Sequence, residues 1–360
     1  DRYASRGLGD VYKRQAVKAL AALAKEPVPE QVNVAYDETR LRFGKAYIIP
    51  KPFDPRLITK IPPAVAKAAM DSGVATQPIE NWKNYEESLE ALLGSDQKLI
   101  RLMQDRAKAK PKKIVYAEAD CLDVLKAAQI VQEEKMGTPV LLGNKAMIES
   151  LKNKLDYGAQ VEIIDPKDDS YQPLREKYAK LFWKAQQRKG YTLYDAERLM
   201  SERNYFAAMM VQNGDADAMI SGYSRNYPTV VKPILEIIPR AKGVRRVAAT
   251  NLMLTKRGPI CLSDTTINVE PNAKELATIA KMTAKTVAMF GIKPVLGMLS
   301  FSNFGSTRFP QAKKVSQAVK LLHRTNPELI VDGPIQSDFS FNNKMLEERF
   351  PFSGLSNKNV

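Results

Sequence analysis

The order of strand-like and helix-like segments predicts an α/β protein with mostly parallel sheets. Short apolar runs alternate with amphipathic stretches from Pro111 to Val331. Strands and helices that alternate in this way form parallel sheets, because each helix returns the chain to the same end of the sheet. The composition agrees, since 44% of the residues are hydrophobic and 26% are charged, as in ordinary globular proteins. A length of 360 residues suits two or more domains.

The composition also excludes several kinds of site. Two cysteines, Cys121 and Cys261, rule out a disulfide scaffold and a Cys-rich zinc module, and we interpret them as small buried residues. The single histidine, His323, rules out a metal site built from several histidines. No apolar run is long enough to span a membrane, and no secretory segment opens the chain. We therefore expect a cytoplasmic protein that does not bind membranes.

The formal net charge of +15 suits nucleic acid, a membrane surface or a polyanionic small molecule such as coenzyme A. The basic residues are spread along the chain, and the densest stretch runs from Arg106 to Lys113. This distribution favours a solvated helix end that leads into a linker. A basic nucleic-acid binder is the non-enzyme alternative, and a gel shift at physiological salt would test it.

The first 93 residues do not follow the α/β pattern. Residues 1–15 have no apolar period, and we interpret them as a non-native scar that is left out of the fold. Residues 16–25 are expected to end a helix, and Tyr47–Ile49 is a short strand-like run. Pro62 and Pro63 are expected to open a further helix. Apolar residues from Trp82 to Leu93 recur at helical spacing and predict core packing.

The regular elements after Pro111 fall into two sets. In the first set, strands are predicted at 114–117, 139–142 and 161–164, with a buried strand at 217–220. Helices are predicted at 123–135, 145–155 and 173–189, with one or two more within 194–213. In the second set, strands are predicted at 244–254, 258–262, 293–300 and 329–331, and helices at 273–290 and 311–325. Asn272 is expected to cap the helix that follows it.

Ligands of open α/β sheets bind beyond the carboxyl ends of the strands, so polar residues just after strands are the candidates. Segment 214–233 offers hydroxyls, a glycine and two cations, which suit a phosphate or another oxyanion: Ser221, Gly222, Ser224, Arg225 and Lys232. Segment 262–277 offers Asp264, Thr265 and Asn268. For Asp264 and Asn268, turn chemistry and a binding role both stay open.

Two later segments complete the candidate site. Segment 297–310 presents hydroxyls and backbone N–H groups that suit an anion: Ser300, Ser302, Asn303, Gly305 and Ser306, with Arg308 beyond them. Segment 328–342 offers Asp332, Gln336 and Asp338, which could orient a substrate or hold an arginine. The sequence contains no P-loop, nucleophile elbow or Gly-x-Gly-x-x-Gly fingerprint.

In this order, the four segments resemble the phosphate acetyltransferase (phosphotransacetylase) family. The shared motifs include Asp-Ala-Asp-x-x-x-Ser-Gly, Met-Leu-Ser-x-Ser-x-x-Gly-Ser and Asp-Gly-x-x-Gln-x-Asp, all between 214 and 338. The resemblance implies two doubly wound α/β subdomains with a cleft between them, at about 95–232 plus 333–360 and at about 233–332. It also implies that the candidate residues, from Ser221 to Asp338, bind acetyl-CoA or phosphate.

Residues 16–93 resemble the end of the malic domain of the large bacterial NADP-dependent malic enzymes. The resemblance rests on IIPKPFDPRLI, on PAVAKAAMDSGVA, and on Trp82 and Tyr85 with the residues before them. In those enzymes a phosphotransacetylase-like domain follows the malic domain. The resemblance implies that 16–93 is the C-terminal remnant of the NAD(P)-binding domain and 94–360 a C-terminally truncated transferase-like domain.

The parent implied by this resemblance is a cytoplasmic homo-oligomer that oxidatively decarboxylates malate to pyruvate. It uses NADP and a divalent metal, Mg or Mn, neither of which this chain would bind. The transferase-like part is expected to bind acetyl-CoA as a regulatory effector, and no catalytic residue of the malic site is expected here. Because 16–93 would be a remnant, we expect Ile48, Ile49 and Val65 to be unusually exposed.

Two departures from the transferase pattern predict that the chain is inactive by itself. Lys232-Pro233 stands where the family has Arg-Pro, and lysine lacks the bidentate fork of arginine. The chain also ends at Val360, before the family's Ser-Arg-Gly catalytic segment. The alternative is a working phosphate acetyltransferase, in which the coenzyme A thiolate attacks acetyl phosphate and Ser300 and Ser306 hold the oxyanion.

Overall fold

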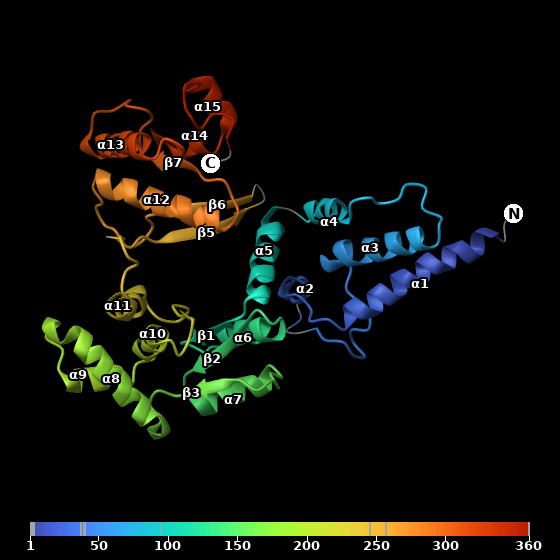
Figure 1. Cartoon of the computed structure of the whole chain (residues 1–360), viewed down its shortest axis with the longest axis horizontal. Coiled ribbons are helices and arrows are strands. Elements are labelled where there is room, and N and C mark those ends of the chain that lie inside the picture. The colour runs from blue at the N-terminus through green and yellow to red at the C-terminus, as the bar shows by residue number, and fades with distance from the viewer. Residues whose placement is uncertain are drawn as a thin grey trace. The chain divides into compact units, whose positions relative to one another are not determined.

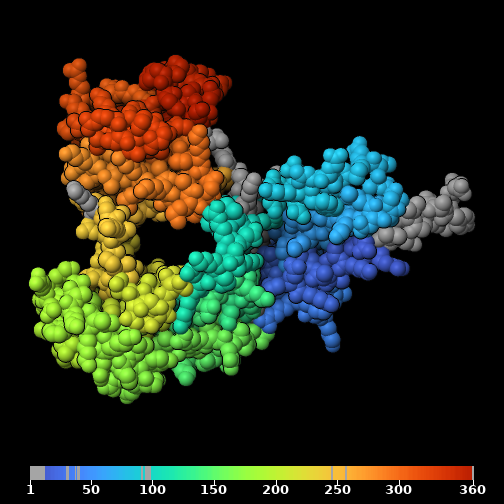
Figure 2. All heavy atoms as spheres, viewed as in Figure 1, coloured from blue at the N-terminus to red at the C-terminus, as the bar shows by residue number. Residues whose placement is uncertain are grey.

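A computed structural model describes residues 4–36, 38, 41–93, 95–244, 246–255 and 258–358 of the chain. These residues form two compact units, Asp1–Pro239 and Arg240–Val360, drawn as packed atoms in Figure 2. The ends of the presumed scar and of the chain, residues 1–3 and 359–360, lie outside the described residues, as does Gly94, the predicted start of the second domain.

The first unit begins with helices and continues as an α/β layer structure (Figure 1). Its leading helices are α1 (Ala4–Ala24), α2 (Glu30–Ala35), α3 (Arg56–Asp71), α4 (Trp82–Ala91) and α5 (Ser95–Ala109). Its strands are β1 (Lys112–Tyr116), β2 (Gly137–Leu142), β3 (Glu162–Ile164) and β4 (Ala218–Ile220). The later helices are α6 (Leu122–Glu133), α7 (Lys145–Lys154), α8 (Gln172–Gln186), α9 (Leu193–Leu199), α10 (Arg203–Asn213) and α11 (Tyr227–Ile237), with 3-10 turns η1 (Asp169–Tyr171) and η2 (Gln187–Lys189).

The N-terminal helices pack around a small core made of Ala24, Val32, Leu41 and Tyr47. As predicted, Ile48 and Ile49 are exposed, at 67% and 58% of their surface, while Val65 is half-buried. The excluded segment 1–15 takes part in the fold from Ala4 onward, because α1 continues through it. Tyr47 forms a single bridge to Gly44 instead of a strand.

Two helix predictions in this region were wrong in detail. Helix α3 begins at Arg56, and Pro62 and Pro63 lie inside it. The buried Asp54 accepts hydrogen bonds from the backbone and the guanidinium of Arg56, which organises an earlier start. The apolar stripe of α4 is only half-buried, and Leu92, just beyond that helix, is 71% exposed.

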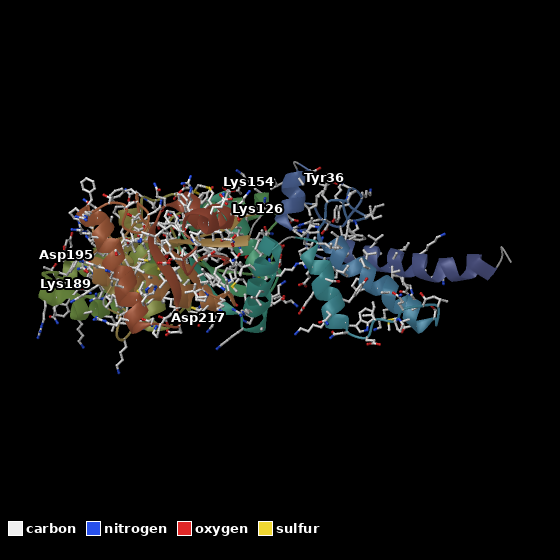
Figure 3. All side chains as sticks on the ribbon, turned by 90° about the horizontal axis from the view of Figure 1, so that it is seen from above. Tyr36, Lys126, Lys154, Lys189, Asp195 and Asp217 are labelled. Atoms are coloured by element: carbon white, nitrogen blue, oxygen red, sulfur yellow. The ribbon has the colours of Figure 1, made fainter. Side chains whose placement is uncertain are left out.

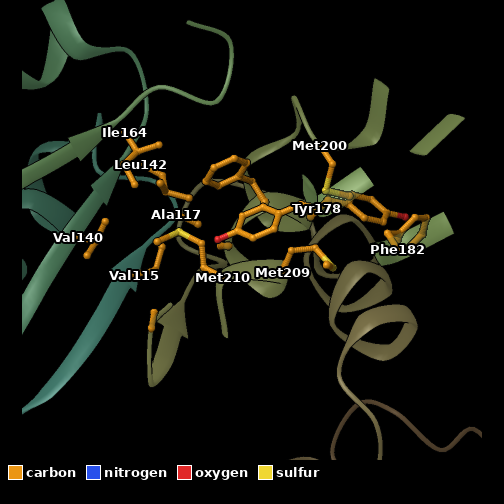
Figure 4. Close-up of a cluster of buried hydrophobic side chains, with 14 of the residues drawn as sticks. Val115, Ala117, Val140, Leu142, Ile164, Tyr178, Phe182, Met200, Met209 and Met210 are labelled. Carbon is orange, nitrogen blue, oxygen red and sulfur yellow. The ribbon is translucent and has the colours of Figure 1, made fainter. Parts of the chain in front are cut away.

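The four strands of the first unit form one parallel sheet in the order β3-β2-β1-β4. Successive residues of a strand point to opposite faces. Val115, Val140 and Ile164 join the core with α8 and α10, shown in Figure 4, whereas Tyr116 and Leu141 join a second core with α6 and α7. Helices therefore cover both faces, and the predicted doubly wound α/β arrangement is confirmed for this unit. Each buried Val or Leu contributes about 1.5–3 kcal/mol.

The strand predicted at 217–220 is confirmed as β4, but the prediction that it is buried was wrong. Among the described residues, strand β4 pairs with β1 alone and stands at the edge of the sheet. Its last residue, Ile220, is 51% exposed. An apolar run of this length cannot tell an edge strand from a central one, because both contain β-branched and aliphatic residues.

The second unit holds strands β5 (Thr250–Thr255), β6 (Gly258–Ser263), β7 (Val295–Leu299) and β8 (Ile330–Ile335). Its helices are α12 (Ala273–Met289), α13 (Pro310–Thr325), α14 (Ser337–Ser340) and α15 (Asn343–Arg349). Strands β7 and β8 are parallel, as predicted, but β5 and β6 form an antiparallel hairpin, since only two residues separate them. Asn272 caps α12 as predicted, in a reciprocal capping box with Glu275.

The last residues of the chain pack in the second unit, whereas the sequence predicted 333–360 to join the first. On one face of β7 and β8, Val331 meets α12 and α13. On the other face, Ile335 packs with Leu346 and Leu355. Helices α14 and α15 complete the cover of that second face, which explains why they group with residues 240–332.

Candidate functional site

The carboxyl ends of β1, β2 and β4 meet at one edge of the first sheet, where the 221–226 loop leaves β4. The Ser221 hydroxyl donates to Asn204 Oδ1 over 2.7 Å. Gly222 has a φ of +106°, a conformation that glycine adopts without strain. At the far end of the loop, Asn226 caps α11 by accepting a hydrogen bond from the Thr229 backbone over 3.2 Å. The structure thus places Ser221, Gly222, Ser224 and Arg225 on one loop beyond the strand, as predicted.

A buried carboxylate that the sequence analysis missed lies under this loop. Glu118, two residues beyond β1, is only 3% exposed. Its Oε2 accepts backbone hydrogen bonds from Tyr223 over 2.7 Å and from Ser224 over 3.1 Å. These two N–H groups, which an anionic ligand would otherwise use, are therefore already engaged. Glu118 directly follows the strand predicted at 114–117, and this position is the sequence signal that marks it.

An ion pair that the sequence analysis also missed lies at the same edge. Both guanidinium Nη atoms of Arg203 donate to the Asp120 carboxylate over 2.6 Å. The hydrogen bonds that Arg203 donates to Asp120 raise the pKa of Arg203, so its charge is fixed. Gly143, after β2, has a φ of +151°, which only glycine adopts without strain, and a Cβ there would stand 3.2 Å from Ile148 Cδ1. The bidentate pair ties the start of α10 to the end of β1.

Lys232 lies on α11 with its side chain 64% exposed. Its Nζ is 3.9 Å from Glu236 Oε1, one helical turn on. The Glu236 carboxylate also accepts hydrogen bonds from Tyr191 over 2.9 Å and from Tyr205 over 2.7 Å. Glu236 is thus held by two hydroxyls, and Lys232 keeps an exposed ammonium group that can reach an anion.

In the second unit, the structure brings the third and fourth candidate segments together. Asn303 Nδ2 donates to Gln336 Oε1 over 2.6 Å, and the Gln336 backbone donates to Asn303 Oδ1 over 2.7 Å. Gly305 has a φ of +89°, and the Ser306 hydroxyl accepts the Asn303 N–H over 3.2 Å. Ser302 is 6% exposed, and its hydroxyl has no partner among the described residues. The pairing fixes loop 300–306 against the start of α14.

The acidic residues of the second unit serve the local fold. Asp332 Oδ2 accepts hydrogen bonds from the Ser353 hydroxyl over 2.9 Å and from the Gly354 backbone over 3.0 Å. Asp332 therefore stabilises the turn at Ser353 and Gly354. Neither of these partners is the arginine that the sequence suggested. Asp338 is exposed on α14. Ser300, from the third candidate segment, donates its backbone N–H to the Ile335 carbonyl over 2.9 Å.

Segment 264–268 is a turn stabilised by its own side chains. Asp264 has a φ of +63°, and Asn268 Nδ2 donates to Asp264 Oδ1 and to the Val247 carbonyl, each over 3.2 Å. The Thr265 hydroxyl donates to Asn251 over 3.2 Å. These contacts explain the residue types by turn chemistry. The prediction that this turn shares one cleft with the other loops stays a prediction.

The remaining candidates carry little chemistry. Cys121 and Cys261 are half-buried, and burial raises the pKa of Cys261. His323 lies on α13, as expected, with Nε2 2.7 Å from the Val331 carbonyl oxygen. A cavity of about 230 Å³ between α8, α10 and α11 is lined by Gln186 and Glu236 and by none of the candidate residues.

The lysines of the first unit are dispersed, and the described helices are not of the membrane-spanning kind. Lys126, Lys154 and Lys189, labelled in Figure 3, lie on three separate elements of the first unit. Positive charge is thus distributed over these elements. Within the described residues, none of the helices combines the length and the apolar character that crossing a membrane requires.

Comparison with known proteins bears out both predicted resemblances. Residues 98–359 match the family model for phosphate acetyl/butaryl transferase. The NADP-dependent malic enzyme of Rhizobium meliloti is 36% identical over 357 residues, which make up 97% of this chain and 46% of that protein. The chain therefore spans about half the length of the curated relatives it matches.

Solved structures support the same fold. The EutD phosphotransacetylase from Staphylococcus aureus is 31% identical, with a TM-score of 0.63, over 74% of this chain and 81% of that one. A phosphotransacetylase from Streptococcus pyogenes is 30% identical, with a TM-score of 0.64, over 73% of this chain and 80% of that one. The predicted phosphotransacetylase-like α/β fold is confirmed.

Proposed function

The chain belongs to the phosphate acetyl/butaryl transferase family, and we propose that it is the acetyl-CoA-binding regulatory part of an NADP-dependent malic enzyme. One observation carries the proposal. Similarity to a malic enzyme extends over 97% of the chain, whereas the transferase model begins only at residue 98. The residues before 98 therefore support a malic-enzyme parent rather than a free-standing transferase.

In this proposal NADP and a divalent metal act in the longer protein, where they serve the oxidation and decarboxylation of malate. The part of the chain that the structure describes contains no group of three or more His, Cys, Asp or Glu residues that could hold a metal ion. We therefore propose no role for the residues of this chain in the oxidation or decarboxylation of malate. We also propose that the parent is cytoplasmic and homo-oligomeric and that it binds neither nucleic acid nor membranes.

The candidate residues suit the chemical groups of acetyl-CoA. Its phosphates are acceptors for cations, and Arg225 and the ammonium of Lys232 are exposed. Its thioester oxygen is an acceptor for hydroxyls, and Ser302 and Ser306 supply them in the second unit.

Lys232 favours effector binding over acetyl transfer. An ammonium group is a point charge that attracts a phosphate without the bidentate geometry of a guanidinium. The carboxylate of Glu236, 3.9 Å away, also offsets part of the positive charge of Lys232. Such a group holds an anion but orients a reacting phosphate poorly. If acetyl-CoA prefers a less active arrangement of the parent, it inhibits malate turnover, and the coupling between the two ligands is reciprocal in binding.

Calorimetric titration of the chain with acetyl-CoA tests the proposal. Wild type should bind, and Lys232→Glu should raise the Kd about tenfold, since it turns a charge-assisted contact into repulsion. Lys154→Glu, the same charge reversal on an exposed residue at the end of α7, is the control and should bind as wild type does. Equal Kd values for the two variants would remove Lys232 from the binding site.

A second assay separates this function from the alternative transferase. The chain should not release coenzyme A thiol from acetyl-CoA in a phosphate-dependent way. Phosphate-dependent release above background would favour the transferase. In the full-length parent, Ser302→Glu and Lys232→Glu should weaken inhibition by acetyl-CoA, and unchanged inhibition in both would exclude these loops as the effector site.

A further inference from the structure

Glu118 is held rigidly from both sides by the ends of two strands. The Ala117 N–H donates to the Ile220 carbonyl over 3.0 Å, at the end of β4. The Ala119 N–H donates to the Leu142 carbonyl over 3.2 Å, at the end of β2. The backbone around Glu118 thus extends the parallel ladder by one bond on each side. This anchoring fixes the backbone of Glu118, and burial together with the two hydrogen bonds to Oε2 leaves its carboxylate little freedom to move.

The anchored carboxylate fixes the middle of the 221–226 loop. Ser221 is held by Asn204, and Asn226 by its cap on α11. Between these ends, the backbones of Tyr223 and Ser224 are held by Glu118 Oε2. The Tyr223 hydroxyl adds a hydrogen bond to Asp123, on the surface. Without Glu118, the two central peptides of the loop would lose their buried partner.

Stability alone does not explain this carboxylate. Its other oxygen, Oε1, is buried and has no hydrogen-bond partner among the described residues. Burying a half-satisfied carboxylate is unfavourable, and such local conflicts concentrate at functional sites. The two alanines on either side of Glu118, Ala117 and Ala119, are fully buried, so an apolar residue would suit the surroundings.

We propose that Glu118 is a positioning residue that holds the 221–226 loop in its ligand-binding shape. Because Glu118 occupies the N–H groups of Tyr223 and Ser224, an anionic ligand meets the side chains of Ser224 and Arg225 instead. The ligand is acetyl-CoA if the proposed function holds, and the inference rests on that function only for the ligand's identity. The shape of the loop is a property of this chain by itself.

Hydrogen exchange of the amides of Tyr223 and Ser224 tests the positioning directly. Glu118→Leu removes the oxygen that accepts both N–H groups, and it should speed the exchange of these two amides about tenfold or more. Glu118→Gln keeps one carbonyl oxygen in place and should stay within about threefold of wild type. Ile164→Val, in the core at β3 on the opposite edge of the sheet, is the control for general destabilisation and should leave these amides protected.

Acetyl-CoA titration of the same variants then measures the consequence for binding. Glu118→Leu should raise the Kd about tenfold, while Glu118→Gln and Ile164→Val stay within about threefold. Unchanged exchange in Glu118→Leu would overturn the proposal, as would faster exchange with unchanged affinity. If wild type does not bind acetyl-CoA, the proposed function fails, whereas the exchange data still decide whether Glu118 holds the loop.

Discussion

At the scale of single residues, charges at the strand ends of the first unit differ from charges on its surface. The Asp120 and Arg203 side chains are 17% and 27% exposed, and they form two hydrogen bonds. Asp120→Asn keeps the shape but removes the charge, and should lower the free energy of unfolding by about 1–3 kcal/mol. Tryptophan fluorescence in urea measures this, because both tryptophans, Trp82 and Trp183, belong to the first unit.

Glu162→Gln is the matched control for that substitution. Glu162 pairs with Lys113 over 2.9 Å, but the two side chains are 50% and 38% exposed. Solvent screening makes such a pair weak, so the expected loss is below about 1 kcal/mol. Equal losses in the two variants would show that the Asp120–Arg203 pair acts as an ordinary surface pair.

The sequence indicated which residue types follow the strands, but not the direction in which their side chains turn. Asn272 was predictable as a cap, because capping depends on neighbours within four residues. Glu118 stands directly after a predicted strand, but its partner Tyr223 lies 105 residues away, and the Ser353 partner of Asp332 lies 21 residues away. A contact across that distance depends on the packed fold and leaves no local pattern.

At the scale of elements, two capping boxes allow the units to be probed separately. Asn272→Ala removes an acceptor for two N–H groups of α12, and should cost about 1 kcal/mol in the second unit. This unit contains no tryptophan. The change should therefore shift the urea transition seen by circular dichroism and leave the fluorescence transition in place. Thr192→Ala removes the capping hydroxyl of α9 in the first unit, so it should shift the fluorescence transition instead.

The approach of β8 to β7 predicts a stronger effect at Gly333. This residue has a φ of +142°, and a Cβ there would stand 2.5 Å from the Met298 carbonyl oxygen. Because that oxygen is backbone and cannot rotate away, Gly333→Ala should destabilise the second unit by about 2 kcal/mol or more. Circular dichroism in urea measures the loss. Gly243→Ala is the control with open space around its Cβ but a similarly positive φ of +82°, and a loss at Gly333 no larger than there would contradict the steric explanation.

The positions of the elements were largely predictable, and their pairing was less so. Periodicity located β1, β2, α6 and α12 to within a few residues. It did not show that β5 and β6 form a hairpin, or that β4 lies at an edge. Strand pairing depends on which apolar faces the helices cover, and a single strand's composition does not contain that information.

At the scale of the whole molecule, the two units differ in their aromatic residues. All fourteen tyrosines lie in the first unit and none in residues 240–360. Burial raises the pKa of Tyr116 to about 12. Burial also raises the pKa of Tyr178 and of Tyr205, and hydrogen bonds to Asp215 and to Glu236 raise them further. Alkaline pH should therefore lower the stability of the first unit through the ionisation of these phenols.

The sign of the effect follows from proton binding. Above pH 10, these phenols lose their protons in the unfolded chain but keep them in the folded unit. Their stabilisation is complete below pH 10 and is lost as the pH rises through the raised pKa values. Between pH 10 and about 12, the free energy of unfolding should fall by about 1.4 kcal/mol per pH unit for each retained proton.

Fluorescence-detected urea unfolding between pH 9 and 11.5 measures this slope for the first unit. Tyr178→Phe removes one of the retained protons, so its slope above pH 10 should be shallower than that of wild type by about 1.4 kcal/mol per pH unit. The circular-dichroism transition of the second unit, which has no tyrosine, should lack this contribution. A slope in Tyr178→Phe equal to that of wild type would mean that Tyr178 ionises alike in both states, and that its hydrogen bond to Asp215, 2.6 Å long, does not hold the proton.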